Sequence, residues 1–250
     1  MRHFFLLILL LLSLSATVAY GQAAPSSAED YFNRGVARNE KGDLDGAIAD
    51  FTKVIEIDPQ SAVTYLNRGN ARDEKGDHDG AMADYNKAIE INPRYAEAYS
   101  NRGLARTFKN DLDGAIADFT KAIEVDPQYA ELYLNRGVAR AGKGDLDRAI
   151  ADFTKAIEII PQLAPAYYGR GSAREDKGDL DGAIADYTKA IEINPQDANA
   201  YAGRGLTKLR QGKDAEAQPD LVTAVKMDSK LKSWVEATTN KIKLARKPKE

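Results

Sequence analysis

Arginine and aspartate recur in matched positions along this chain, and their spacing is the first pattern that suggests chemistry. In each pair the aspartate follows the arginine by 16 residues. Such a pair could belong to an active site, but identical pairs at regular intervals are more typical of structure. We therefore predict stabilising ion pairs that specify packing: Arg34 with Asp50, Arg68 with Asp84, Arg102 with Asp118, Arg136 with Asp152, Arg170 with Asp186, and Arg204 with Asp220.

Other candidates for chemistry are few. The chain has no cysteine and two histidines, His3 and His78, which leaves thiol catalysis, disulfides and metal sites almost no raw material. The recurrent Asp-Leu-Asp-Gly run lacks the third ligand, the glycine spacing and the distal glutamate of a calcium loop, so helix capping explains it better. His78 stands where sister segments have leucine and is interpreted as a turn residue. We predict no catalytic residue, no metal site and no cofactor.

The amino terminus has the pattern of an export signal. After Met1, Arg2 and His3, an unbroken apolar run extends from Phe4 to Leu12 and is followed by small residues. The run is shorter than the ~20 residues that a spanning helix needs, which favours a cleaved signal peptide over a retained anchor. We predict a signal peptide over residues 1–21, a linker over 22–27, and a periplasmic or secreted protein without stable membrane insertion after cleavage.

Charge is distributed unevenly between the body and the tail. Residues 22–230 contain 28 basic and 36 acidic residues, whereas residues 231–250 contain six basic and two acidic residues. Nucleic-acid binding needs clustered Lys and Arg, so the acidic body argues against a nucleic-acid partner. The basic tail alone could touch an anionic surface.

The residues named so far belong to a repeat of 34 residues. The phrase that begins Tyr31-Phe32-Asn33-Arg34-Gly35 returns with a tyrosine every 34 residues, up to Tyr201. Such a period governs the fold, because each copy is one supersecondary unit that packs on its neighbours. The copies span residues 28–61, 62–95, 96–129, 130–163, 164–197 and 198–231.

Each copy predicts two amphipathic helices that form a hairpin. Gly42 and its equivalents stand between them, and the third copy has Asn110 there, another residue that tolerates left-handed backbone geometry. Asp43 and its equivalents are suited to cap the second helix, and a second aspartate such as Asp45 favours its positive end. Pro59 and its equivalents disfavour helical geometry in the preceding residue.

The sixth copy departs from this pattern. Leu221 replaces the aromatic residue, Ser229 replaces the proline, and Pro219 lies inside the second helix, where it predicts a distortion. Residues 232–250 then predict a capping helix and a basic tail. Five residues, four of them apolar, share one face of that helix: Leu231, Trp234, Val235, Thr238 and Ile242.

The repeated pattern closely resembles the tetratricopeptide repeat family. The match is carried by Tyr31, Gly35, Ala47, Phe51, Val54 and Pro59, while Arg34 and Arg38 replace the family's leucine and tyrosine. The resemblance covers about four-fifths of the chain. It implies an all-α, right-handed superhelical solenoid of six helix-turn-helix repeats, whose concave face is lined by the first helix of each repeat.

The concave face is the candidate binding site implied by this resemblance. Asparagines in register offer both a donor and an acceptor to an extended peptide backbone, and apolar neighbours offer pockets for its side chains. Solvated surface asparagines without a function are the alternative. The candidate partner-binding residues are Phe32, Asn33, Leu66, Asn67, Asn70, Asn101, Leu104, Leu134, Asn135 and Tyr168.

We therefore expect a non-catalytic, exported scaffold that binds a protein or an extended peptide on its concave face. One alternative is a structural element that assembles with itself or within an envelope complex. Another is a hydrolase, for which the sequence shows no nucleophile and base. The sequence does not define the oligomeric state or the partner, because one fold serves many functions.

Overall fold

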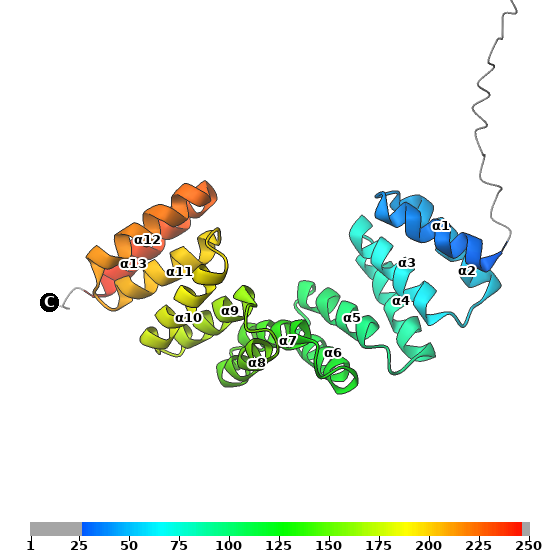
Figure 1. The fold of residues 1–250 in the computed structure, drawn as a ribbon, viewed down its shortest axis with the longest axis horizontal. Coiled ribbons are helices and arrows are strands. Elements are labelled where there is room, and N and C mark those ends of the chain that lie inside the picture. The colour runs from blue at the N-terminus through cyan, green and yellow to red at the C-terminus, as the bar shows by residue number, and fades with distance from the viewer. Residues whose placement is uncertain (1–26, 247–250) are drawn as a thin grey trace, which may run out of the picture.

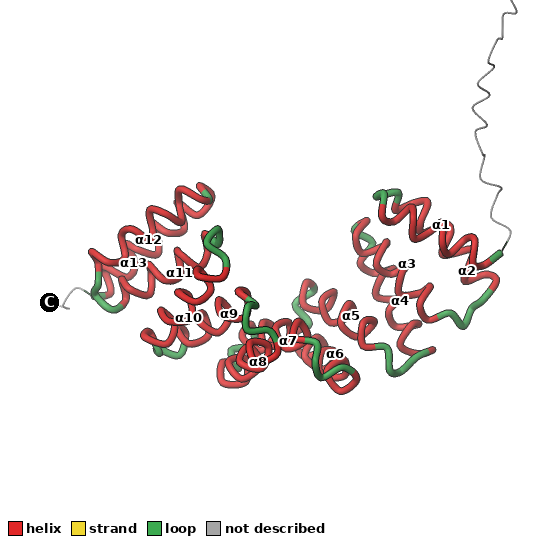
Figure 2. The backbone as a smooth tube through the Cα atoms, in the orientation of Figure 1, coloured by secondary structure: helices red, strands yellow, loops and turns green. Residues whose placement is uncertain are grey.

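The computed structural model describes residues 27–246, and these form six helical hairpins followed by one further helix. The predicted signal peptide, most of the linker, and the last four residues of the tail lie outside the described residues. Figure 2 shows helices joined by short loops throughout the described chain. The helices are α1 Ala28–Glu40, α2 Leu44–Ile57, α3 Ala62–Lys75, α4 His78–Ile91, α5 Ala96–Phe108, α6 Leu112–Val125, α7 Ala130–Gly142, α8 Leu146–Ile159, α9 Ala164–Asp176, α10 Leu180–Ile193, α11 Ala198–Arg210, α12 Asp214–Met227 and α13 Lys232–Ala245, with a short 3-10 helix at Ser229–Leu231.

The hairpins stack side by side into an open arch (Figure 1). Each odd-numbered helix from α1 to α11 lies on the inner side of the arch, and its even-numbered partner lies on the outer side. Each hairpin packs on the hairpins before and after it, so the core is continuous along the arch. This architecture is the predicted all-α repeat solenoid.

The turn inside each hairpin is built as the sequence predicts. Gly42 has a φ of +76°, and Asn110, its equivalent in the third copy, has a φ of +60°. This left-handed residue lets the chain satisfy the carbonyls at the end of the inner helix: the amide of Gly42 donates to the carbonyl of Asn39, and that of Asp43 to Arg38. The single Gly-to-Asn replacement therefore preserves the helix stop.

Aspartate caps the outer helix in four of the five copies for which a cap was predicted. The Asp111 carboxylate accepts a hydrogen bond from the amide of Gly114 at 3.0 Å, and a Cβ on Gly114 would lie 2.2 Å from that carboxylate. In the fourth copy Arg148 replaces this glycine, and Asp145 makes no side-chain capping bond. The carboxylate of Asp145 pairs instead with Arg148 at 3.1 Å, so the predicted cap at Asp145 is wrong.

Close packing inside a hairpin depends on a glycine facing an aromatic ring. A Cβ on Gly103 of α5 would lie 2.8 Å from Cε1 of Phe119 on α6, which is too close for carbon atoms. Phe119 and its neighbours Ala115 and Ala122 are fully buried. The glycine therefore lets the helices approach until the ring fills the space between them.

The predicted ion pairs are present in all six hairpins. In the third, Nε and Nη2 of Arg102 donate to the two oxygens of Asp118 at 2.9 and 2.6 Å. Arg106 donates to the same carboxylate at 2.7 Å, and Asp118 is only 2% exposed. Arg106 is equivalent to Arg38, which replaces the family's tyrosine, so the second departure from the family pattern completes this network. The carboxylate is fully engaged in structure, which favours the structural interpretation over a catalytic one.

The arginine of each pair also connects successive hairpins, which the sequence analysis did not predict. Arg102 stacks over Tyr99 with its Cζ 5.5 Å from the ring centroid, and its Nη1 donates to Asn86 of the preceding hairpin at 2.7 Å. In the second, fourth, fifth and sixth hairpins the arginine donates to a threonine at the place of Asn86. One guanidinium thus binds its own helix, its partner helix and the previous hairpin.

A second set of contacts between hairpins lies at the exposed turns. The lysine at or just after the end of each inner helix pairs with the aspartate in the first turn of the preceding outer helix. The sequence pattern predicts an interaction of these aspartates with the positive end of their own helix, and the partner in the next hairpin is an additional finding. The contacts are Lys75 with Asp45, Lys109 with Asp79, Lys143 with Asp113, and Lys177 with Asp147, and Gln211 donates to Asp181 in the same place.

The carboxyl-terminal end is closed by α13, which begins 34 residues after α11 and therefore continues the period. Val235 and Ile242 of α13 are buried with Leu206, Leu209 and Leu221. Trp234 is 49% exposed, so its predicted place on the buried face is wrong. Pro219 lies within α12, yet α12 is continuous from Asp214 to Met227, so the predicted distortion does not interrupt that helix.

Candidate functional site

The inner side of the arch presents one exposed stripe on each odd-numbered helix. The other sides of these helices pack on their partner and on the neighbouring hairpins, so most of their exposed side chains lie on the inner side. On α5 the stripe consists of residues about one turn apart: Glu97, Asn101, Leu104 and Phe108. We call this surface, with its equivalents on α1 to α11, the inner stripe.

Exposed apolar side chains gather at the centre of the inner stripe. Phe108 is 87% exposed, Leu104, one turn before it, is 38% exposed, and Val138, the equivalent of Leu104 on α7, is 50% exposed. Gly142 takes the place of Phe108 on α7 and adds no charge. These residues form an uncharged apolar centre on the third and fourth hairpins.

Phe108 is the residue that the sequence analysis missed. A signal was available, because its equivalents in the sister copies are polar, charged or glycine: Glu40, Glu74, Gly142, Asp176 and Arg210. A phenylalanine there has no role in the repeated core. Large exposed aromatic residues are common anchors of protein interfaces.

Acidic residues flank the apolar centre along the inner stripe. The exposed ones are Glu29 and Glu40 on α1, Glu74 on α3, Glu97 on α5 and Asp176 on α9. Arg210 is the corresponding basic residue, and it lies at the carboxyl-terminal end. The surface therefore favours basic side chains around an apolar centre, with the opposite preference at α11.

The predicted asparagines are in register, but three of them already make hydrogen bonds. Nδ2 of Asn67 donates to the carbonyl of Val63 at 2.8 Å. Oδ1 of Asn70 accepts from Asn101 at 2.8 Å and from the Tyr85 hydroxyl at 3.0 Å. Asn101 therefore links α5 to α3, and its Nδ2 is already engaged within the protein.

The remaining asparagines differ from these three. Asn33 is exposed and Asn135 is half-buried, and neither side chain bonds to another residue within 27–246. They keep both the donor and the acceptor available for a peptide backbone.

The predicted apolar contacts are only partly accessible. Leu66 is 2% exposed and packs with Ala81, Tyr85 and Ala98, so the expectation that it contacts a partner is wrong. Leu134 is half-buried between two core clusters. Phe32 and Tyr168 are also half-buried, with their ring centroids 5.8 Å from Phe51 and 5.6 Å from Tyr187. Burial, with smaller contributions from Asp197 and Glu175, raises the pKa of Tyr168.

No group of three or more potential metal ligands occurs within residues 27–246. His78 begins α4, and its Nδ1 lies 2.8 Å from Oδ1 of Asp73, in an exposed pair. Over the same residues, every helix is too short or too polar to cross a bilayer.

The repeated hairpins match known family models. Four segments match a family model described as TPR repeat, residues 35–73, 69–107, 108–144 and 173–212, and residues 130–163 match a model described as tetratricopeptide repeat. The chain belongs to the tetratricopeptide repeat family. Proteins with this fold are typically non-catalytic scaffolds that commonly mediate protein–protein interactions.

Solved structures of tetratricopeptide repeat proteins share the fold. The crystal structure of MamA protein is 32% identical, covers 68% of this chain and 93% of its own, and superposes with a TM-score of 0.63. YrrB, described as a TPR protein with an unusual peptide-binding site, is 24% identical over 72% of this chain and 92% of its own, with a TM-score of 0.61. A tetratricopeptide repeat protein from Parabacteroides merdae covers 89% of this chain and 94% of its own, with 19% identity and a TM-score of 0.70. No curated protein matched the chain.

Proposed function

We propose that this tetratricopeptide repeat protein is an exported adaptor that binds an extended polypeptide along its inner stripe. The observation that supports this most is the apolar centre, where Phe108, Leu104 and Val138 remain exposed on adjacent hairpins. The proposed partner has an apolar side chain that packs on this centre and basic side chains that meet the flanking acids. Asn33 and Asn135 are available to hydrogen-bond its backbone.

Export is supported by the sequence pattern of the first residues. A basic residue, the apolar run Phe4–Leu12 and the small residues after it have the order of a cleaved signal. Mass spectrometry of the intact exported protein is expected to give a chain that begins between Tyr20 and Pro25. A secreted or periplasmic chain that still carries Met1 would contradict this assignment.

Peptide binding can be tested with a library that is not biased toward any partner. Residues 22–250 would be immobilised and used to select peptides from a random display library, and the selected peptides would be titrated by calorimetry. Burial of a phenylalanine contributes about 1.5–3 kcal/mol, so Phe108→Ala is expected to weaken binding roughly tenfold to a hundredfold. Lys121→Ala, an exposed change on outer helix α6, is the matched control and should leave the affinity unchanged. If Lys121→Ala weakens binding and Phe108→Ala does not, the outer side is the binding surface.

A further inference from the structure

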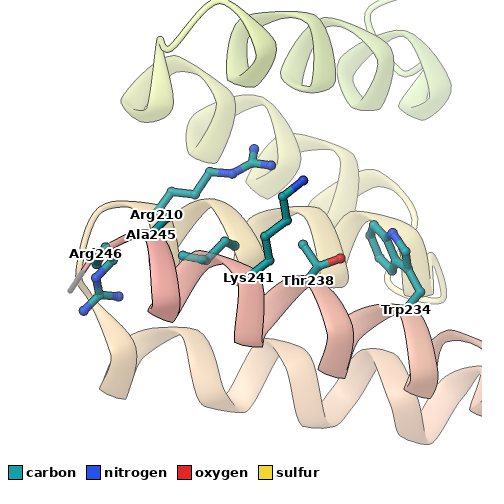
Figure 3. Close-up of a pocket in the computed structure, with 7 residues that line it drawn as sticks. Arg210, Trp234, Thr238, Lys241, Ala245 and Arg246 are labelled. Carbon is teal, nitrogen blue, oxygen red and sulfur yellow. The ribbon is translucent and has the colours of Figure 1, made fainter. Parts of the chain in front are cut away.

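A pocket of roughly 560 Å³ lies between the end of α11 and the helix α13, outside the repeated part of the inner stripe (Figure 3). Its walls include three cationic side chains, Arg210, Lys241 and Arg246, and the apolar side chains of Trp234 and Ile242. Its volume is within the range of small-molecule and side-chain binding sites. Neither the family pattern nor the predicted site includes this pocket.

The three cations differ in how they are engaged. Nη1 of Arg246 donates to the carbonyl of Leu209 at 2.8 Å and to Asp214 at 2.6 Å. Arg210 pairs with Glu175, whose other oxygen accepts from the Tyr187 hydroxyl. Lys241 has no carboxylate partner in the described part of the chain. Figure 3 shows the side chains of Lys241 and Arg210 extending toward the same side, while Arg246 points away. The pocket therefore holds one uncompensated positive charge beside a second cation.

The apolar wall exists because of a change in one repeated position. The equivalents of Trp234 on the inner helices α3 to α11 are all smaller and fully buried: Thr64, Ala98, Leu132, Ala166 and Ala200. An indole is larger than any of these side chains, and α13 packs mainly on α11 and has little contact with α12. Trp234 is left half-exposed beside Thr238 and Lys241, as Figure 3 shows.

The inner stripe ends at this pocket. On α11 the stripe positions Gly203 and Leu206 are buried, and Leu206 packs with Val235 and Ile242 of α13. Arg210, the last stripe position, remains exposed and lines the pocket. A polypeptide that follows the stripe from α1 toward α11 is therefore blocked by α13 where the local charge changes from acidic to basic.

We propose that this pocket binds the carboxyl-terminal residue of a polypeptide, with the carboxylate at Lys241 and Arg210 and an apolar side chain against Trp234 and Ile242. The direction that this gives to a longer peptide, with its carboxyl terminus at α13, rests on the proposed function. Binding of a terminal residue by itself is independent of the proposed function, because the pocket is built entirely from α11 and α13. The ligand chemistry is a carboxylate adjacent to a large apolar side chain.

Trp234 makes the test specific, since it is the single tryptophan of the chain. The full mature chain would be titrated with N-acetyl-Leu-Phe, excited at a wavelength that only tryptophan absorbs, and the same titration repeated with the peptide amide. The tryptophan fluorescence is expected to change and to saturate at a free-acid peptide concentration below about 10 mM. A charged hydrogen bond predicts about tenfold weaker binding for the amide and for Lys241→Gln. Lys243→Gln, a change to another exposed lysine of α13, is the control and should bind as wild type.

Several outcomes would overturn the proposal, and each is separate from failure of the proposed function. Equal affinity for the acid and the amide would show that no carboxylate is recognised. Equal losses for Lys241→Gln and Lys243→Gln would show only general charge attraction, and no saturable response would show no site. N-acetylated, amidated dipeptides that contain Asp or Glu test side-chain carboxylates. If they bind as tightly as the free carboxyl terminus, the pocket recognises acidic side chains within a polypeptide and not its terminus. Phe108→Ala should leave dipeptide binding unchanged while it weakens the display-selected peptides, so the two proposals can fail independently.

Discussion

The interior hairpins and the carboxyl-terminal end of the arch hold their helices together in different ways. In the third hairpin a phenylalanine packs on Gly103 between alanines, and two arginines bind the buried Asp118. In the sixth hairpin Leu221 replaces the aromatic ring, Lys208 replaces the second arginine, and α13 adds aliphatic side chains. Both regions keep a buried aspartate bound by two cations, but the interior adds the fit of an aromatic ring against glycine, whereas the end adds burial of aliphatic surface.

The difference follows from what each region must specify. An interior hairpin has nearly identical neighbours on both sides, so a purely apolar contact would permit several registers. Directional contacts between hairpins, such as the hydrogen bond from Arg102 to Asn86 and the pair of Lys109 with Asp79, favour one register. The end has a single neighbour, and its main requirement is to cover the last apolar face.

The largest expected effect comes from stranding the buried carboxylate of an interior hairpin. Replacing Arg102 alone leaves Asp118 bound to Arg106. We therefore expect the double variant Arg102→Leu with Arg106→Leu to lose far more stability than the single variant, about 3–5 kcal/mol of unfolding free energy. Adding Asp118→Leu should recover much of that loss, because no charge is then buried without a partner. Urea unfolding of the single, double and triple variants measures this coupling. Additive losses in the triple variant would mean that these groups do not act as a unit.

The same network makes a prediction for acid. Burial opposes ionisation of Asp220 in the sixth hairpin, but hydrogen bonds from Arg204 and Lys208 outweigh it and lower the pKa. An acid with a lowered folded-state pKa stabilises the fold above its unfolded pKa, about 3.9, and that stabilisation is lost as the pH falls through the folded value. Thermal unfolding of Asp220→Asn should therefore show a smaller loss of stability on acidification below pH ~4 than wild type. Parallel acid profiles for the two proteins would contradict this assignment.

Changes to the steric fit between helices should affect stability less than loss of the buried ion pairs, and should affect the two regions differently. Gly103→Ala places a methyl group against the rigid ring of Phe119 and should cost about 1–2 kcal/mol. In the sixth hairpin the methyl group of Gly205→Ala would lie 2.7 and 2.9 Å from Cδ2 and Cγ of Leu221 and 3.2 Å from the carbonyl oxygen of Ala217. An aliphatic side chain can change rotamer more easily than a packed ring can move, so we expect a smaller cost than for Gly103→Ala. Urea midpoints of the two variants compare the regions directly. Equal losses would show that the aromatic ring confers no special restriction.

A comparison within the interior isolates the cap. Asp111→Ala removes a capping bond and should cost about 1 kcal/mol. Asp145→Ala should cost less, because Asp145 contacts Arg148 and caps nothing. Melting temperatures of the two variants measure the difference.

The smallest expected effect is at the exposed contacts between hairpins. Lys109 forms a hydrogen bond with Asp79 and lowers its pKa. Lys109→Ala should return the pKa of Asp79 toward its ordinary value, which NMR titration of the carboxylate would detect. The stability change should be slight, since exposed ion pairs contribute little.

The features that the sequence predicted are those determined within one copy. The hairpin turn at Asn110, the cap at Asp111 and the pairing of Arg102 with Asp118 depend on residues a short distance apart, and six copies reveal them. Contacts between copies were harder to predict. Lys143 meets Asp113 of the preceding hairpin because of how hairpins stack.

The candidate site was predicted less completely for a related reason. The family resemblance predicts which helices line the inner side, but it does not predict how exposed each of their side chains is. Leu66 is buried because its own hairpin and Ala98 of the next cover it, whereas Phe108 near the turn is covered by neither. Trp234 was misplaced because a helical face was inferred without knowing that α13 packs mainly on α11 and has little contact with α12, which leaves the indole 49% exposed.

The lysine and aspartate contacts all run in one direction, from each hairpin back to the one before it. An inserted copy of 34 residues would bring both halves of the contact with it, and would leave every existing contact with an identical partner. The number of copies therefore sets the length of the arch without changing the contacts between neighbouring hairpins. Its two ends would keep their separate properties while the span between them changed in fixed steps.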